Sequence, residues 1–262
     1  MKPAPTPAAG PVIQMTGVTA CTMRQPLRVA VEAVDWSVAP GDYWILVGLH
    51  ATGKSDLLML TAGLTTPGAG EYRLFGQPMP IFEEARLATR LRLGLVFDGG
   101  QLFNHLTVAE NVALPLCYHQ NLSAAAAADR VAALLALAGL TARAERTPGA
   151  LSHPERRRAG LARALALQPE VLLLDNPLGG LDVREAAWWQ GLLERLWAGH
   201  EPAVAQPLTL VVTASTLRPW RGHGRQLGLI ANRRLEILGG WADAERSTDP
   251  LVCEMLAAGQ PG

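Results

Sequence analysis

One short stretch constrains this chain more than any other. Residues 48–55 read GLHATGKS and fit the pattern G-x-x-x-x-G-K-[ST], with an apolar run, YWILV, before them and a helix-like run, DLLMLTAGL, after them. Glycines let backbone N–H groups wrap around phosphate oxygens, and the start of the helix adds the positive end of its dipole. A chance glycine-rich turn would lack this context, so the sequence predicts a phosphate-binding loop.

The loop also predicts roles for its side chains. We expect Lys54 to reach the β- and γ-phosphates and the Ser55 hydroxyl to ligate Mg²⁺. Lys2 and Lys54 are the only lysines among 23 basic residues, so a chain that otherwise uses arginine keeps a compact point charge where it suits phosphate. The predicted nucleotide-binding residues are Gly48, Leu49, His50, Ala51, Thr52, Gly53, Lys54, Ser55 and Asp56.

A second candidate metal ligand lies far along the chain. Asp175 ends the apolar run VLLLD, and a carboxylate at the carboxyl end of a strand can hold Mg²⁺ through water. An aspartate that only caps the next helix is the alternative. The phosphate loop favours the metal role.

The order of patterns predicts an α/β fold. Short strands fill residues 12–47, with a turn at APGD, and a buried strand is expected within 91–97. Residues 99–150 have a helical pattern, in which Ser123 is a candidate cap. A helix over 153–167, a strand over 171–175, a helix over 183–198, a strand over 208–214 and a strand pair within 226–240 follow. Alternation of this kind predicts a mostly parallel sheet covered by helices.

Composition narrows the class. Acidic and basic residues balance at 23 each, so no basic excess points to nucleic acid, and no apolar run reaches the roughly 18 residues of a membrane span. Residues 1–11, rich in proline and alanine, are expected to be a disordered tail. Three widely spaced cysteines are expected to be buried, reduced thiols.

The motifs together resemble an ABC-transporter nucleotide-binding domain over residues 12–262. They run in the family order GLHATGKS, GLVFD, TVAENVALPL, LARALALQPEVLLLD, GGLD and LTLVVTAS. LFNHLTVAENVALPL and the ending STDPLVCEMLAAG look most similar to the Mla-type branch, which is linked to phospholipid trafficking and solvent tolerance.

The resemblance implies a P-loop NTPase (ABC ATPase) core with an N-terminal antiparallel β part and an inserted helical subdomain. The core would comprise 12–98 and 155–240, the helical subdomain 99–154 and a C-terminal segment 241–262. It also implies ATP and Mg²⁺ as cofactors, and a cytoplasmic subunit on the inner face of the membrane. Such a subunit pairs head-to-tail, as a homodimer or heterodimer, and docks on a membrane permease.

The chain departs from the family pattern at chemical positions. Asn176 stands where the family has a catalytic glutamate, and Ala214 where a histidine contacts the γ-phosphate. An amide cannot accept a proton near neutral pH, and a methyl group offers neither donor nor acceptor. Asp98 replaces a glutamine that senses nucleotide, although a carboxylate remains a good Mg²⁺ ligand. Thr22 stands near the place of the aromatic residue that stacks on adenine.

The signature motif is altered as well. LSHPE, residues 151–155, replaces LSGGQ, so that His153 and Pro154 stand where two glycines would approach phosphate. Ser152 and Glu155 form a capping-box pattern, which predicts that the helix still begins there. By resemblance, Ser152, His153, Pro154, Glu155 and Asp182 are the signature and dimer-contact residues.

These losses lead to a hypothesis. The residues for binding are kept and those for hydrolysis are replaced, which favours a pseudo-ATPase that binds Mg·ATP and hydrolyses it poorly. The alternatives are an active ATPase whose catalytic groups come from elsewhere, such as Asp98 or a partner chain, and a scaffold that keeps the fold only for protein interaction. Trp188, Trp189, Trp197 and Trp220 are expected to be ordinary core and rim packing rather than an interface.

Overall fold

The computed structural model describes residues 10–23, 25–79 and 87–257. The predicted tail therefore lies outside the described residues except for its last two positions. In the same ranges, no helix combines the length and apolarity that a membrane crossing needs.

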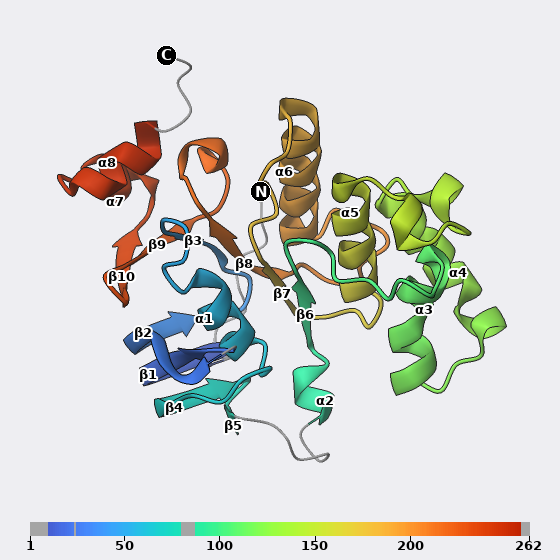
Figure 1. The fold of residues 1–262 in the computed structure, drawn as a ribbon, viewed down its shortest axis with the longest axis horizontal. Coiled ribbons are helices and arrows are strands. Elements are labelled where there is room, and N and C mark those ends of the chain that lie inside the picture. Colours follow the sequence, from blue (N-terminus) through green and yellow to red (C-terminus); the bar gives the residue numbers. More distant parts are fainter. Residues whose placement is uncertain (1–9, 24, 80–86, 258–262) are drawn as a thin grey trace.

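The main sheet has six strands in the order β10-β9-β3-β8-β7-β6 (Figure 1). Five of them are parallel, namely β3 (Tyr43–Val47), β6 (Leu93–Val96), β7 (Val171–Leu174), β8 (Thr209–Ala214) and β9 (Gln226–Ala231). The last strand, β10 (Arg234–Gly239), runs antiparallel to β9. Every residue of β3, β7 and β8 is buried, as expected for parallel strands covered on both faces. The predicted parallel core is confirmed.

A smaller antiparallel sheet flanks the core, with two strands before β3 in the chain and two after it. Its order is β2-β1-β4-β5, formed by β1 (Ile13–Thr22), β2 (Gln25–Val38), β4 (Ala69–Leu74) and β5 (Gln77–Met79). Helix α1 (Lys54–Thr61) packs between this sheet and the main one, where Leu57, Leu58 and Leu60 join a shared apolar core. This packing fixes the position of the loop that leads into α1.

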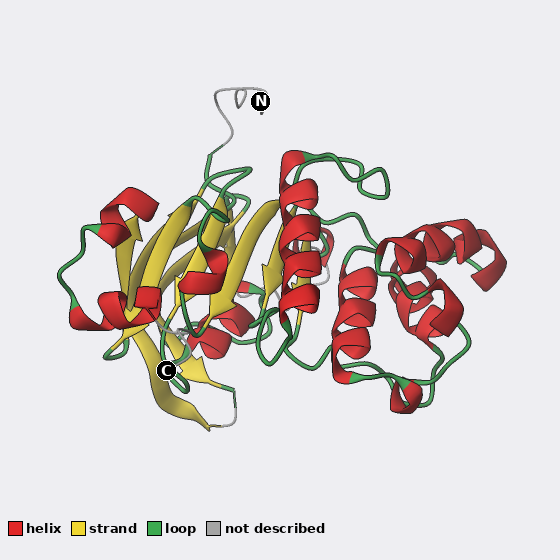
Figure 2. Cartoon of the chain, turned by 90° about the horizontal axis from the view of Figure 1, so that it is seen from above, coloured by secondary structure: helices red, strands yellow, loops and turns green. Residues whose placement is uncertain are grey.

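Three helices form a lobe beside the sheet, with α3 and α4 farthest from it (Figures 1 and 2). They are α3 (Val108–His119), α4 (Ala124–Leu137) and α5 (His153–Ala164). The Ser123 hydroxyl accepts from Ala126 N–H, so it caps α4 as predicted, and the apolar face of α4 is buried against α3 and α5. The predicted boundary after residue 154 falls inside α5, which connects the lobe to the core.

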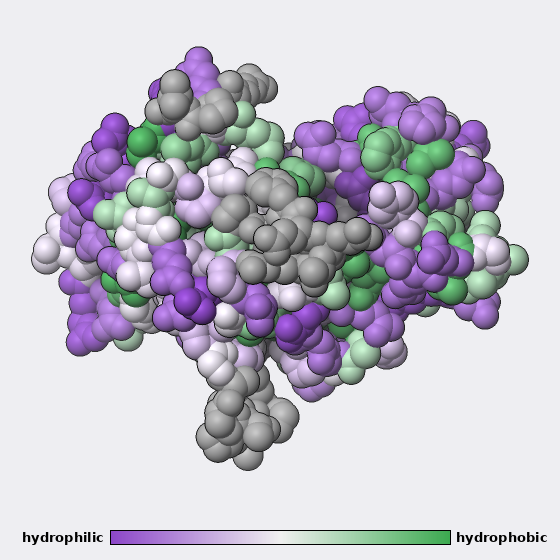
Figure 3. All heavy atoms as spheres, turned by 90° about the horizontal axis from the view of Figure 1, so that it is seen from below, coloured by the Kyte–Doolittle hydropathy of each residue, from purple (hydrophilic) through white to green (hydrophobic). Residues whose placement is uncertain are grey.

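The remaining helices are α2 (Leu87–Arg90), α6 (Val183–Ala198), α7 (Trp241–Glu245) and α8 (Pro250–Ala257), with short 3₁₀ turns at Thr141–Arg143, Pro148–Ala150 and Arg218–Trp220. Of these helices, α6, α7 and α8 contribute buried residues to the core and α2 does not. Viewed from below, much of the surface is hydrophilic, with small apolar groups between (Figure 3).

Two sequence expectations about packing have opposite outcomes. Trp189 and Trp220 are buried and Trp188 and Trp197 pack partly buried against the same core, which confirms the packing interpretation. The cysteines do not follow the prediction of burial, because Cys21 and Cys117 are only partly covered and Cys253 is exposed. Cys253 lies on the outer side of α8, whose buried positions are Val252 and Met255.

The predicted helix over 153–167 also ends earlier, at Ala164.

Candidate nucleotide-binding site

The loop between β3 and α1 needs its glycines. A Cβ at Gly48 would lie 2.5 Å from the carbonyl oxygen of Ile230, and Gly53 has a φ of +96° with Val31 only 2.8 Å from where its Cβ would be. Gly53 is also the residue just before α1, so the left-handed turn leads directly into the helix. The predicted strand–loop–helix context is therefore present, with a backbone that only glycine fits at both ends.

Lys54 folds back over this loop. Its Nζ donates to the carbonyl oxygens of Gly48, at 2.7 Å, and Leu49, at 2.6 Å, and the residue is only 8% exposed. Burial lowers the pKa of the Lys54 ammonium, while the nearby Asp175 carboxylate acts in the opposite direction. A phosphate group has the charge and the acceptor oxygens to replace these two carbonyls as partners of the ammonium.

Two of the three predicted metal ligands, Ser55 and Asp175, meet, although 120 residues separate them. Ser55 Oγ donates to Asp175 Oδ1 at 3.0 Å, and Thr213 Oγ1 donates to the same oxygen at 2.8 Å. Asp175 follows β7, Thr213 lies in β8 and Ser55 is in the first turn of α1, so three elements converge at the carboxyl ends of the parallel strands. Hydroxyl and carboxylate oxygens are the ligands that Mg²⁺ prefers, so this donor set fits the metal.

The rest of the loop surrounds this centre. Leu49 is about half exposed and Ala51 adopts a φ of +60°, while the Thr52 hydroxyl donates to the Leu49 carbonyl oxygen at 3.0 Å. His50 is exposed. Asp56 accepts from Met23 N–H at 3.3 Å and thereby ties α1 to the end of β1. All the predicted loop residues therefore lie at one end of α1.

Two hollows lie beside the loop and share Thr22. One, of about 720 Å³, is lined by Thr22, Asp56, Asp98 and Asp175 among others, and the other, of about 390 Å³, by Thr22, Arg28 and residues 51–53. Thr22 therefore lies next to the phosphate loop, where the sequence predicted the counterpart of the adenine-stacking residue.

The altered chemical positions share a third hollow, of about 500 Å³. Asp98, His153, Asn176 and Ala214 all line it. Asn176 has a φ of +47°, and its backbone N–H donates to Thr213 Oγ1 at 3.0 Å, while Ala214 ends β8 and is 3% exposed. The structure thus brings together positions that lie far apart in the sequence.

The signature segment forms the predicted cap. Ser152 Oγ accepts from Glu155 N–H at 3.3 Å, Glu155 Oε2 accepts from Ser152 N–H at 2.8 Å, and Pro154 lies in the first turn of α5. The bond from the Ser152 backbone is the main reason that the pKa of Glu155 is lowered. Asp182 caps α6 by accepting from Glu185 N–H at 2.9 Å. Both predicted contact segments are therefore helix starts, and His153 is exposed at one of them.

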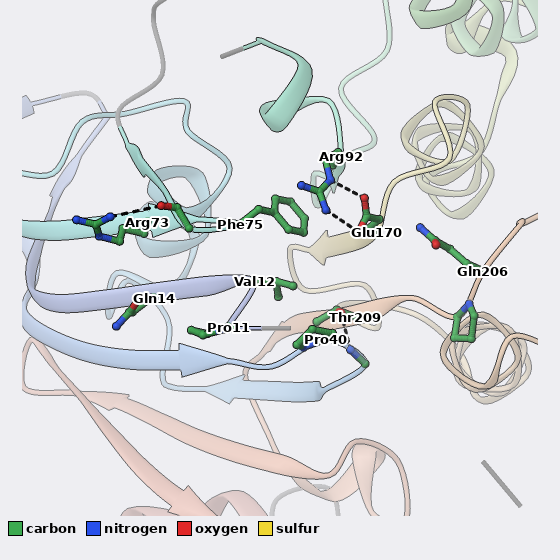
Figure 4. A pocket seen from close by; sticks show the side chains of 14 residues that line it. Pro11, Val12, Gln14, Pro40, Arg73, Phe75, Arg92, Glu170, Gln206 and Thr209 are labelled. Carbon is green, nitrogen blue, oxygen red and sulfur yellow. Dashed lines mark hydrogen bonds and ion pairs between the residues drawn. The ribbon is translucent and has the colours of Figure 1, made fainter. Parts of the chain in front are cut away.

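Another hollow, of about 800 Å³, lies away from this site (Figure 4). It opens at the amino ends of the parallel strands, near Thr209. Its charged groups are already paired. Arg92 forms a two-point pair with Glu170, at 2.5 and 2.9 Å, and stacks on Phe75, and Arg73 pairs with Glu71 at 2.5 Å. Ligands of open parallel sheets bind at the carboxyl ends of strands, so we place the nucleotide site at the phosphate loop.

Two residues of the site were missed by sequence reasoning. Thr213 joins Asp175 to the backbone of Asn176, and Arg157 binds Asp98 from α5. Thr213 could have been noticed as a polar residue directly after the apolar run LTLVV. Arg157 could not, because it is the middle residue of RRR and nothing in the sequence shows which arginine is buried.

The fold and the loop define a P-loop nucleotide-binding domain. A family model described as ABC transporter matches residues 31–179. The chain is 36% identical over 212 residues to the lipoprotein-releasing system ATP-binding protein LolD of Psychrobacter arcticus, covering 80% of this chain and 88% of that protein. It therefore belongs to the ABC transporter family, as an ATP-binding subunit.

Further comparisons agree with this assignment. The chain is 36% identical over 233 residues to the taurine import ATP-binding protein TauB of Mesorhizobium japonicum, covering 88% of this chain and 82% of that one. The ATP-binding cassette MJ0796, solved as a dimer bound to ADP and Pi, superposes with a TM-score of 0.75 at 26% identity and covers 87% of this chain and all of that one.

Proposed function

We propose that this chain binds Mg·ATP at the phosphate loop and hydrolyses it poorly. Lys54 would hold the phosphates, and Ser55 and Asp175, which are already in contact, would hold Mg²⁺. When bound, Mg²⁺ supplies charge neutralisation at the phosphates. Asp98 lines the same hollow as Asp175, but its Oδ1 is paired with Arg157.

The observation that carries the proposal is that Asn176 and Ala214 line one hollow. The amide of Asn176 cannot take a proton from water near neutral pH, and the methyl group of Ala214 cannot contact a phosphate through a hydrogen bond. Loss of a general base typically slows a reaction by about 10²–10⁴-fold. We therefore expect binding without ordinary turnover.

The test compares binding with turnover in the same preparation. Equilibrium titration with ATP and Mg²⁺ should show binding that Lys54→Ala abolishes, while phosphate release stays near background. Ordinary turnover that depends on Lys54, with the chain alone or with its natural partner, contradicts the proposal. Absence of Mg·ATP binding would instead favour the scaffold hypothesis.

Restoring the missing groups separates a weakened ATPase from one that uses other groups. Asn176→Glu combined with Ala214→His should raise turnover sharply if these two positions limit the rate. The matched control is Asn176→Gln with Ala214→His, which adds similar bulk at residue 176 but no base. Equal rates in the two double variants would show that a base at residue 176 is not what is missing.

The proposal extends to the assembly. In a head-to-tail dimer of two copies, both sites would lack the base and contain LSHPE. In a heterodimer, one site would combine this phosphate loop with the partner's signature and the other would use LSHPE. We propose such a subunit docked on a permease at the cytoplasmic face of the membrane. The dimeric MJ0796 cassette supports the pairing.

For the cargo we propose a lipid or lipid-linked molecule. The support is the likeness of residues 102–116 to the Mla-type branch and the similarity to LolD, a lipoprotein-releasing protein. TauB is an import protein for taurine, a small sulfonate, so the cargo needs its own test. Purification of the native complex, followed by extraction and mass spectrometry of bound lipids, decides it, and a complex that retains only small polar solutes excludes lipid.

A further inference from the structure

A buried guanidinium in α5 binds two loops of the nucleotide site. The Arg157 side chain is 1% exposed, and its Nη2 donates to Asp98 Oδ1 at 2.5 Å. Its Nη1 donates to the carbonyl oxygens of Pro177, at 2.7 Å, and Gly179, at 3.1 Å. Asp98 follows β6, and residues 177–179 follow β7. One side chain therefore joins both loops to the helix that begins with LSHPE.

The loop after β6 also lies directly on α5. A Cβ at Gly160 would come within 2.8 Å of Gly100 Cα, and a Cβ at Gly100 would overlap the backbone of Arg156. Arg163, another residue of α5, donates to the Gly100 carbonyl oxygen at 3.0 Å. The loop is thus attached to the helix at two points, and glycine on each side allows the backbones to touch.

The free-energy cost of burying the Arg157 cation gives Asp98 a structural role. A buried cation is stable only when it is paired and hydrogen-bonded, and breaking such a pair by removing one partner leaves an uncompensated charge. Four of the contacts of Arg157 are to oxygen, but the carboxylate of Asp98 supplies the negative charge among them. The Asp98 side chain is 52% exposed, so it reaches from solvent toward the buried cation.

We propose that Arg157 is a positioning residue that fixes both loops to α5, and that Asp98 is its counter-ion rather than a ligand of Mg²⁺. The position of the loop after β6 is then set by α5 and not by nucleotide. The Mg²⁺ readout below rests on the proposed function, whereas the stability and exchange readouts do not.

A double-mutant cycle tests the pairing. Asp98→Ala should lower the Tm by at least about 4 °C, because it leaves the buried Arg157 guanidinium without a counter-ion. In an Arg157→Gln background the same change should cost almost nothing, since glutamine keeps donors for the carbonyls without the charge. Equal losses of Tm in both backgrounds would overturn the proposal.

Hydrogen exchange tests the positioning. In Asp98→Ala, amides of residues 97–101 and 178–180 should both exchange at least about fivefold faster, although about 80 residues separate the two loops. A change confined to residues 97–101 contradicts the role of Arg157 as a shared anchor. This readout also holds if Arg157→Gln does not fold.

A Mg²⁺ titration distinguishes the two roles of Asp98, counter-ion of Arg157 or ligand of Mg²⁺. Binding of a fluorescent ATP analogue should need the same Mg²⁺ concentration, within about twofold, in Arg157→Gln and in Arg157→Gln with Asp98→Ala. Ser55→Ala is the matched control and should need at least about tenfold more. A shift in the double variant as large as that of Ser55→Ala refutes the counter-ion role. If wild type binds no Mg·ATP, the proposed function fails, and the first two tests still decide the positioning.

Discussion

At the scale of single residues, the backbone conformation at position 176 favours asparagine, apart from any catalytic role of the side chain. Its φ of +47° lies in the left-handed region, where asparagine is several-fold enriched among non-glycine residues. Its carbonyl accepts from Gly179 N–H at 3.0 Å and its N–H donates to Thr213, so both neighbouring segments hold this conformation. A glutamate placed here has to adopt a backbone conformation that suits asparagine better.

This conformation predicts a stability effect that is independent of catalysis. Asn176→Glu should lower the free energy of unfolding by about 1 kcal/mol, because the left-handed backbone conformation costs more free energy for glutamate than for asparagine. Asn176→Gly, which has no such penalty, is the control and should lose less. Urea unfolding of the three proteins measures both differences, and a glutamate variant at least as stable as the glycine variant contradicts the expectation.

The same residues show how much of the site could be predicted from the sequence. The phosphate loop, Ser55 and Asp175 were predictable because a spaced motif fixes a loop and strand ends share one edge of the sheet. Thr213 stands out in the sequence only as a polar residue beside an apolar run, which does not show what it contacts. For Arg157 the sequence does not show which arginine of RRR turns inward. The pairing of Asp98 with Arg157 is therefore information that only the fold supplies.

At the scale of elements, α5 begins with a complete capping box despite its altered signature. Ser152→Ala removes one acceptor for the free N–H groups of the first turn and should lower the free energy of unfolding by about 1 kcal/mol. Ser123→Ala, at the start of α4, is a matched change at a cap outside the nucleotide site. Urea unfolding of both variants checks this, and an unchanged Ser152→Ala protein would mean that α5 is held by packing alone.

The cap also gives a pH dependence. Because the pKa of Glu155 is lowered below its ordinary value of 4.5, the unfolded chain binds more protons than the folded chain between the two pKa values. The contribution of Glu155 to stability is therefore present at neutral pH and is lost as pH falls through the folded pKa. Solvent screens this partly exposed carboxylate, so the effect is small.

Glu155→Gln isolates that contribution. Unfolding free energies of wild type and variant should differ at neutral pH and converge as the pH falls through the folded pKa of Glu155, which lies below its ordinary value. A difference that stays constant over that range would assign the effect of the substitution to side-chain packing instead of charge.

At the scale of the whole molecule, Arg130 connects the helical lobe to the core. From α4 it donates to the carbonyl oxygen of Leu165, at 2.8 Å, and to that of Ala203, which lies between α6 and β8. Burial lowers the pKa of its guanidinium. This side chain therefore joins three parts of the chain that are distant in sequence.

Removing this link should loosen the lobe more than the core. Arg130→Ala removes the donor to the Ala203 carbonyl and one of the two donors to the Leu165 carbonyl, which keeps the Gln168 N–H, and should cost about 1–3 kcal/mol of unfolding free energy. Hydrogen exchange should rise in α4 and near residue 203 while β3 and β7 stay protected. Arg143→Ala, which removes an exposed pair with Glu155, is the control and should change little. Uniformly faster exchange would contradict a local link.

The architecture was largely predictable at this scale, and the attachment of the lobe was not. Apolar runs such as VLLLD and LTLVV mark buried parallel strands, and Ser123 and Asp182 mark helix starts, because these are local signals. The end of α5 at Ala164 and the exposed position of Cys253 depend on how neighbouring elements pack. Local patterns do not contain that information.

The scarcity of lysine has a practical consequence for this protein. The chain has only two lysines, and the ε-amino group of one of them, Lys54, is enclosed by the phosphate loop. A protease that cuts only after lysine, applied to unfolded protein, would have just two cleavage points. Acylation of Lys54 by a reagent that resembles the nucleotide would remove one of these two cleavage points. The fraction of protein left uncut at Lys54 would then equal the fraction of molecules whose phosphate loop had bound the reagent.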